Sequence, residues 1–101
     1  MGTGTEQTSG SQAVERSLVI ENKYGLHARP ATQFVETASR FNCEVTILKD
    51  GEEVNGKSIM GLMMLGAEMG SKLTVRCSGS DDALACLDSL LALVDSKFGE
   101  E

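Results

Sequence analysis

The sequence predicts an α+β fold: an open-faced β-sandwich with a four-stranded antiparallel sheet and three helices on one face. Four segments alternate apolar and polar residues as strands do, and others repeat apolar residues with a helical period. These segments follow one another in the order β-α-β-β-α-β-α. Alternation that buries one face of each strand is typical of an antiparallel sheet with its other face in water.

The first strand is predicted over residues 14–20, with Leu18 and Ile20 pointing inward. A polar loop follows, and the period changes at His27, so we expect a helix to begin at or just after this residue. Pro30 then lies in the first helical turn, where its missing N–H is not needed. The apolar face of this helix consists of Ala31, Phe34, Val35, Ala38 and Phe41.

The second strand and its hairpin come next. Its inward residues are Cys43, Val45 and Ile47. The dipeptide Asp50-Gly51 predicts a tight turn, and residues 53–56 form a short returning strand. Ser58 is placed to cap a short helix over residues 59–65.

The last strand and the last helix complete the domain. The strand covers residues 72–78. Its inward residues are Leu73, Val75 and Cys77. Ser80 or Asp81 is expected to cap the final helix. The apolar stripe of that helix is predicted to be Leu84, Leu87, Leu91, Val94 and Phe98.

Length and charge limit the function. A chain of 101 residues has the size of one domain, which we divide into a flexible polar leader (1–13), a folded domain (14–98) and a short tail (99–101). The net charge of −6 argues against nucleic-acid binding, which usually needs a basic face. No apolar run is long enough for membrane insertion, and residues 1–12 lack the basic and apolar parts of a signal peptide. We therefore expect a cytoplasmic protein.

The cysteines do not have the spacing of a metal site. Cys43, Cys77 and Cys86 include no C-x-x-C pair, and His27 is the single histidine of the chain. A zinc site built from cysteine and histidine is therefore not expected. We expect three reduced, mostly buried thiols that pack as small apolar side chains, and neither a metal nor a cofactor.

The start of the first helix is the candidate site for chemistry. The backbone N–H groups of Ala28 and Arg29 are unpaired at a helix N-terminus, where the helix dipole favours anions such as phosphate. The same field disfavours a charged imidazolium, so His27 is expected in its neutral, nucleophilic form. Arg29 adds a cation that suits phosphate oxygens. Alternatively, His27 is a plain cap and Arg29 a solvated side chain.

Two separate blocks of the sequence resemble those of one known family. The blocks are residues 20–35 (IENKYGLHARPATQFV) and residues 55–67 (NGKSIMGLMMLGA). The first resembles the active-site signature, and the second the regulatory-serine helix, of the HPr family, the histidine-containing phosphocarriers of the phosphoenolpyruvate-dependent phosphotransferase system (PTS). The resemblance covers about residues 14–98, and the family's order of strands and helices agrees with the order predicted here.

The resemblance implies a role for each matching residue. His27 would accept a phosphoryl group at Nδ1 from phosphorylated enzyme I, with Arg29 steadying that group, and pass it to enzyme IIA domains in sugar uptake. Ser58 would be phosphorylated by an HPr kinase/phosphorylase where the host has one. An apolar docking surface for enzyme I and the IIA domains would consist of Ile59, Met60 and Met63. Such a protein is a carrier rather than a turnover enzyme, and we expect a monomer.

The short helix supports a docking surface on physical grounds as well. It contains more apolar residues than one buried face can absorb, so part of it should be exposed. The alternative is that all of these residues pack in the core. Ser58 likewise has a plain structural role as an N-cap, whether or not it is a regulatory site.

Two other functions remain open from the sequence. One is a nitrogen-related phosphotransferase carrier: residues 21–25 and the ending 98–101 favour that branch, whereas residues 57–61 favour carriers regulated at serine. The other is a non-catalytic α+β module that binds a small ligand, which would need a concave, mostly apolar pocket.

Overall fold

The computed structural model describes residues 13–100 and confirms the predicted fold class. The elements are β1 (Ala13–Val19), α1 (Ala28–Ala38), β2 (Glu44–Lys49), β3 (Glu52–Asn55), α2 (Ile59–Met64), β4 (Lys72–Ser78), α3 (Ala83–Asp95) and the 3-10 turn η2 (Lys97–Gly99). The sheet order is β1-β4-β2-β3, and all neighbouring strands are antiparallel. Of the predicted leader, only Ala13 lies within the described residues, and it begins β1.

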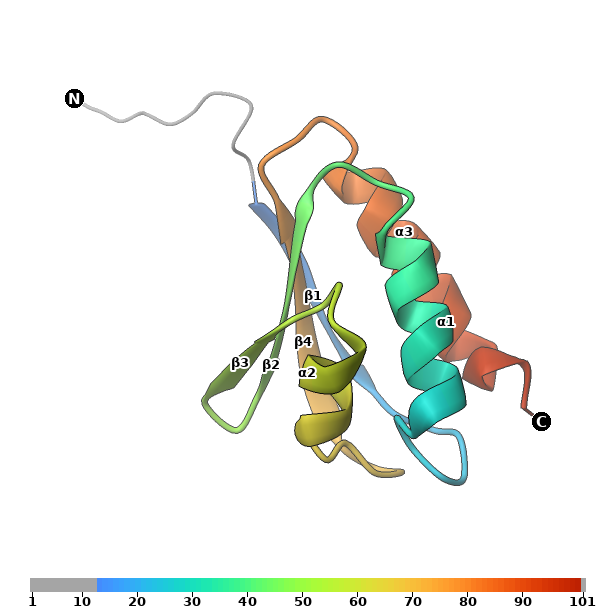
Figure 1. The fold of residues 1–101 in the computed structure, drawn as a ribbon. Coiled ribbons are helices and arrows are strands. Elements are labelled where there is room, and N and C mark those ends of the chain that lie inside the picture. The colour runs from blue at the N-terminus through green and yellow to red at the C-terminus, as the bar shows by residue number, and fades with distance from the viewer. Residues whose placement is uncertain (1–12, 101) are drawn as a thin grey trace.

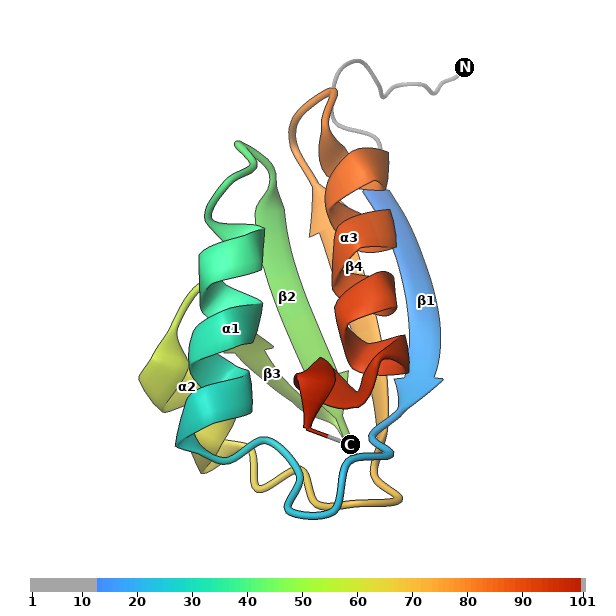
Figure 2. The same ribbon diagram turned by 90° about the vertical axis from the view of Figure 1, so that its right-hand side faces the viewer.

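The helices cover one face of the sheet. α1 and α3 run side by side across it, and α2 lies next to α1 (Figures 1 and 2). The buried residues between these layers form one apolar core that includes Phe34, Ile47, Leu62 and Leu87. Within residues 13–100, no helix has both the length and the hydropathy to cross a bilayer.

The strands alternate as predicted, with small shifts at their ends. In β4, one of the two central strands, the inward residues Leu73, Val75 and Cys77 are all buried. β1 ends at Val19 rather than Ile20, but Ile20 is still buried just beyond the strand. Leu18 is only half-buried because β1 is an edge strand.

The predicted hairpin joins β2 to β3. Asp50 and Gly51 both have positive φ angles, 51° and 86°. Positive φ at both central residues is what a type I′ turn requires, and this turn matches the twist of the paired strands. The dipeptide therefore sets the register of this hairpin, in which Lys49 lies opposite Glu52.

The apolar stripe predicted for the last helix is partly wrong. Leu84 is 52% exposed, and Leu91 is only partly buried. The residues of α3 that face the core are Ala83, Cys86, Leu87, Leu90 and Val94. Apolar residues lie on nearly every side of α3, so their spacing does not define which side is buried. Phe98 is buried as predicted, but it lies in η2 with a left-handed φ of 57° rather than in the helix.

The cap predicted for the last helix is also wrong, because the N-cap is Asp82 rather than Ser80 or Asp81. The Asp82 carboxylate is not used within its own helix. It accepts hydrogen bonds from the backbone N–H groups of Asn42 (2.8 Å) and Cys43 (3.2 Å) and from the Ser80 hydroxyl (2.6 Å). Asp82 therefore ties the start of α3 to the loop between α1 and β2.

We predict that the hydrogen bonds accepted by the Asp82 carboxylate make folding stability depend on pH. The Ser80 hydroxyl, followed by the Asn42 backbone, lowers the pKa of Asp82 below its usual value. A carboxyl whose pKa is lowered by folding stabilises the fold above its unfolded pKa of about 4, and this contribution is lost as the pH falls through the folded pKa. Asp82→Asn should therefore lower the Tm at pH 7, with a difference from the wild type that shrinks towards pH 2.

The neighbouring residue provides the control for this prediction. Asp81 is exposed at the same end of the helix. Asp81→Asn removes the same charge but leaves the hydrogen bonds of Asp82 in place. Thermal unfolding followed by circular dichroism between pH 2 and 7 measures both variants. Equal Tm values for Asp82→Asn and Asp81→Asn at pH 7 would contradict the claim that the hydrogen bonds of Asp82 stabilise the fold.

Candidate functional site

The predicted site lies at the N-terminus of α1, which begins where the sequence indicated. His27 is the N-cap residue, with an extended backbone (φ −80°, ψ −173°), and its side chain makes no capping hydrogen bond. Pro30 is buried in the first turn. The first N–H groups of an α-helix have no acceptor within the helix. The amides of Ala28 and Arg29, which directly follow His27, therefore remain available as donors for an anion.

The loop before His27 is fixed by a close approach of two backbone segments. Gly25 has a φ of 69°, and a Cβ at this position would collide with the backbone of Ala67. The next residue, Leu26, donates its N–H to the Ala67 carbonyl over 2.9 Å. Glycine is required here both for its φ angle and for space. The loop that carries His27 is thus held against the segment after α2.

Glu100, the second-to-last residue of the chain, is part of the site, although sequence reasoning assigned it to a tail. One oxygen of its carboxylate lies 3.0 Å from Nε2 of His27. The other accepts a hydrogen bond of 3.0 Å from the side-chain amide of Asn22. Asn22 is fully buried and also donates to the Gly25 carbonyl over 2.8 Å. A buried side chain from the loop before His27 therefore positions Glu100 against the imidazole.

The contact with Glu100 determines which nitrogen of the ring is free. An ionised carboxylate can only accept hydrogen bonds, so Nε2 of His27 must carry the proton that it donates to Glu100. In a neutral imidazole the other nitrogen, Nδ1, then has its lone pair available. The side chain is 41% exposed. The contact thus leaves the lone pair of Nδ1 free in a half-exposed neutral ring.

A polar pocket of about 420 Å³ surrounds the ring. It is lined by Lys23, Tyr24, His27, Arg29, Gln33, Phe98, Gly99 and Glu100. The Tyr24 ring stands edge-on to the imidazole, with centroids 6.1 Å apart. Two cations, Lys23 and Arg29, share this pocket with a single carboxylate. Such a balance suits an incoming anionic group.

Comparison with known protein families identifies the family of this chain. A family model described as "PTS HPr component phosphorylation site" matches residues 14–96. The chain belongs to the HPr family. The phosphocarrier protein HPr of Neisseria meningitidis is 46% identical over 87 residues, which are 86% of this chain and 97% of that protein.

Other phosphocarriers are similarly close. The phosphocarrier protein NPr of Shewanella violacea is 45% identical over 87 residues, covering 86% of this chain and 94% of that protein. Among solved structures, an HPr from Thermoanaerobacter tengcongensis superposes with a TM-score of 0.82 at 45% identity, covering 87% of this chain and 98% of that one. This chain therefore matches the HPr family in both sequence and fold over nearly the whole domain.

Ser58, the predicted regulatory residue, lies at the start of α2. Ser58 is the N-cap, as predicted, and its hydroxyl oxygen accepts a hydrogen bond from the Gly61 N–H over 3.0 Å. α2 lies beside α1 in both views, on the side of the molecule that carries the His27 loop (Figures 1 and 2). The two predicted sites therefore lie on neighbouring helices.

The apolar residues of α2 do not all pack in the core. Leu62 is fully buried, whereas Met60 is 70% and Met63 44% exposed. Ile59, at the first position of the helix, is also exposed. Partial exposure was predicted from the number of apolar residues in this short helix, and it is confirmed. The sequence did not single out Met64, which is 78% exposed and enlarges the same surface.

Proposed function

We propose that this member of the HPr family accepts a phosphoryl group on Nδ1 of His27 from phosphorylated enzyme I and passes it to enzyme IIA domains. The observation that supports this proposal is the contact between Nε2 of His27 and Glu100. It directs the free lone pair of the imidazole to Nδ1, beside the N-terminus of α1. Family membership supports the same kind of chemistry.

The transfer step follows from this arrangement. The lone pair of Nδ1 attacks phosphorus, a P–N bond forms, and the bond from phosphorus to the donor breaks with its electron pair leaving on the donor. The proton of Nε2 stays in place, so positive charge develops on the His27 ring as the bond forms. The Glu100 carboxylate, 3.0 Å from Nε2, stabilises that charge. Glu100 is thus a positioning residue that also favours the charged product.

The phosphoryl oxygens are held by groups on the other side of the ring. The amides of Ala28 and Arg29 lie at the positive end of the α1 dipole. The Arg29 guanidinium lines the same pocket and suits phosphate oxygens by charge and shape. The site is half-exposed, so these interactions remain moderate and the phosphoryl group can be passed on.

We assign docking of enzyme I and the IIA domains to the exposed surface formed by Ile59, Met60 and Met63. Methionine side chains are flexible and polarizable, which suits a surface that meets several partners. The neighbouring Met64 extends this surface. The contact between Leu26 and Ala67 links the His27 loop to the end of this helix region, so one partner can reach both.

Phosphorylation of Ser58 by an HPr kinase/phosphorylase would regulate this docking, and a charged substitution tests the idea. Ser58→Asp places a negative charge beside the exposed Ile59 and Met60. Burying that charge against enzyme I is unfavourable, so we expect phosphorylation of His27 to slow by roughly tenfold, about 1.4 kcal/mol. The initial rate of phosphoryl uptake from enzyme I measures the effect.

The control for this prediction is Ser58→Ala. It removes the oxygen that accepts the Gly61 N–H and should lower the free energy of unfolding by about 0.5–2 kcal/mol. It adds no charge, so its phosphorylation rate should stay near that of the wild type. Equal rates for the wild type and Ser58→Asp would remove the regulatory assignment.

The downstream acceptor is proposed to be a IIA domain of sugar uptake, with a nitrogen-related IIA domain as the second candidate. Relatives named HPr and NPr match this chain at almost the same identity, 46% and 45%. Phosphorylated protein mixed with each kind of IIA domain distinguishes the two, because the correct acceptor gains the phosphoryl group faster. Preferential transfer to the nitrogen-related domain would replace the sugar-uptake proposal.

The proposal as a whole is tested by mass measurement. Incubation of the full chain with phosphoenolpyruvate and enzyme I should add the mass of one phosphoryl group, and this group should be lost in acid. A ligand-binding module would bind its ligand without this covalent change, in a mostly apolar pocket. The pocket at His27 is instead lined mainly by charged and polar side chains. Absence of the mass gain in the folded wild type would favour the module.

A further inference from the structure

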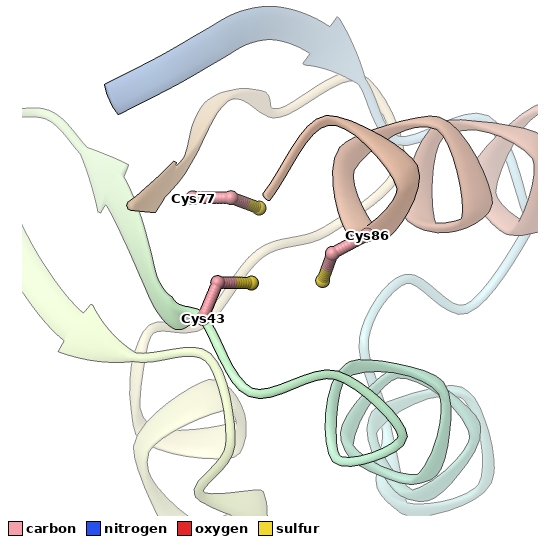
Figure 3. Close-up of side chains that lie close together, drawn as sticks. All are labelled: Cys43, Cys77 and Cys86. Carbon is pink, nitrogen blue, oxygen red and sulfur yellow. The ribbon is translucent and has the colours of Figure 1, made fainter. Parts of the chain in front are cut away.

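Three thiols that the phosphocarrier chemistry does not use converge in the core. Cys43 lies just before β2, Cys77 lies in β4, and Cys86 lies in α3. Their sulfur atoms all lie within 4.8 Å of one another, and all three residues are buried and free of disulfides. Figure 3 shows the three side chains pointing toward a common point between the strands and α3. The fold thus gathers every cysteine of the chain in one place.

We propose that Cys43, Cys77 and Cys86 form a binding site for a trivalent, thiophilic metalloid, with arsenite as the probe. Sulfur ligands select soft ions and metalloids. Three sulfurs bonded to one atom at about 2.3 Å stand about 3.5–4 Å apart. The observed separations, none above 4.8 Å, need only a small inward movement of the side chains to reach this geometry.

The number of ligands argues against zinc at this cluster. Structural zinc takes four ligands. Among residues 13–100, no histidine or carboxylate joins the three sulfurs. His27, the single histidine of the chain, contacts Glu100 instead. A three-coordinate centre is therefore what this cluster can complete.

Charge distinguishes a trivalent centre from divalent and monovalent ions. Three thiolates around a divalent ion carry a net charge of −1, and around a monovalent ion −2, whereas a trivalent centre is neutral. A buried net charge is unfavourable in an apolar core. Burial already raises the pKa of the Cys77 thiol to about 11 and also raises the pKa of the Cys86 thiol, so these surroundings favour neutral sulfur. The neutral complex is the one that this core accommodates.

The binding step conserves charge and oxidation state. Arsenite is present near neutral pH as neutral As(OH)₃. Three As–O bonds break and three As–S bonds form. Each thiol proton leaves with one hydroxide as water, so three molecules of water are released. Arsenic remains trivalent and the sulfurs are not oxidised.

The cluster is separate from the phosphocarrier site. His27 precedes α1, whereas Cys43 follows its opposite end, and the 11-residue helix spans about 16 Å. Loading the cluster is expected to leave the His27 site intact. The sulfurs are buried, so loading requires a local opening near the start of α3, where Asp82 holds the backbone of Cys43. We therefore expect slow loading followed by retention in the folded state.

Native mass spectrometry of the reduced full chain after long incubation with arsenite tests the proposal. The expected product has one added arsenic atom and three fewer hydrogen atoms. Binding to the native state should raise the Tm by several degrees. X-ray absorption at the arsenic edge should count three sulfur neighbours and no oxygen. This last measurement uses the wild type and does not depend on the folding of any variant.

Single substitutions identify the ligands. Cys43→Ala, Cys77→Ala and Cys86→Ala should each weaken arsenite binding by at least tenfold. Val75→Ala is the matched control, because it also opens space in the core of β4 but leaves the three thiols in place. No bound arsenic, a loss of only two hydrogen atoms, or a lower Tm on loading would overturn the proposal. The same holds if any cysteine variant binds as tightly as the wild type.

Discussion

The substitution His27→Ala is expected to abolish phosphoryl uptake from phosphorylated enzyme I. His27 is the single histidine of the chain, so no other imidazole can replace it. Its side chain is 41% exposed and lies at a helix end rather than in the core, so the fold should remain. We expect no mass gain after incubation with enzyme I and phosphoenolpyruvate, together with a native circular dichroism spectrum.

The control for this experiment is Gln33→Ala. Gln33 lines the same pocket but is assigned no role in transfer. This variant should gain one phosphoryl group at a rate within about twofold of the wild type. A phosphoryl group that survives the removal of His27 would place the acceptor elsewhere in the chain and end the proposal.

The second large effect is expected for Glu100→Gln. The amide keeps the size of the side chain but removes the charge that favours a protonated Nε2 and a positive ring in the product. Loss of a carboxylate that orients a metal-bound histidine reduces activity by about 10- to 100-fold, and we take this range as the guide for Glu100. We expect a decrease in this range in the single-turnover rate of His27 phosphorylation, with little change in Tm.

The control for Glu100→Gln is the same change at an exposed residue. Glu21 lies in the loop before His27 and is exposed, so Glu21→Gln alters the net charge equally without touching the ring. Equal rates for these two variants would show that only long-range charge matters. A slow Glu100→Gln variant beside a normal Glu21→Gln variant would confirm that the contact itself is required.

The parts of the fold that were predicted correctly have local causes. The start of α1 follows from the change of period at His27 and from Pro30 in the first turn. The β2–β3 turn follows from two residues that tolerate positive φ. The Ser58 cap depends on a hydrogen bond to a residue only three positions away. Each of these features is determined within a few residues, so a sequence pattern is enough to reveal it.

The side-chain contacts that sequence reasoning missed join distant parts of the chain. Glu100 lies 73 positions from His27, and no spacing rule connects the two. Asp82 accepts a hydrogen bond from the backbone of Asn42, 40 positions away, and no local pattern predicts this contact. The three cysteines come together from separate segments of the chain, so their spacing in the sequence does not reveal the cluster. Packing of the whole domain decides such contacts.

The central claim is that Glu100 leaves Nδ1 of His27 free to receive phosphorus, and nitrogen NMR of the ring tests it most directly. The chain has one histidine, so ¹⁵N-labelled histidine reports on this ring alone. The neutral ring should have its proton on Nε2, and after reaction with enzyme I and phosphoenolpyruvate, Nδ1 should couple to ³¹P. A proton on Nδ1 in the free protein, or phosphorus on Nε2 after the reaction, would contradict the account.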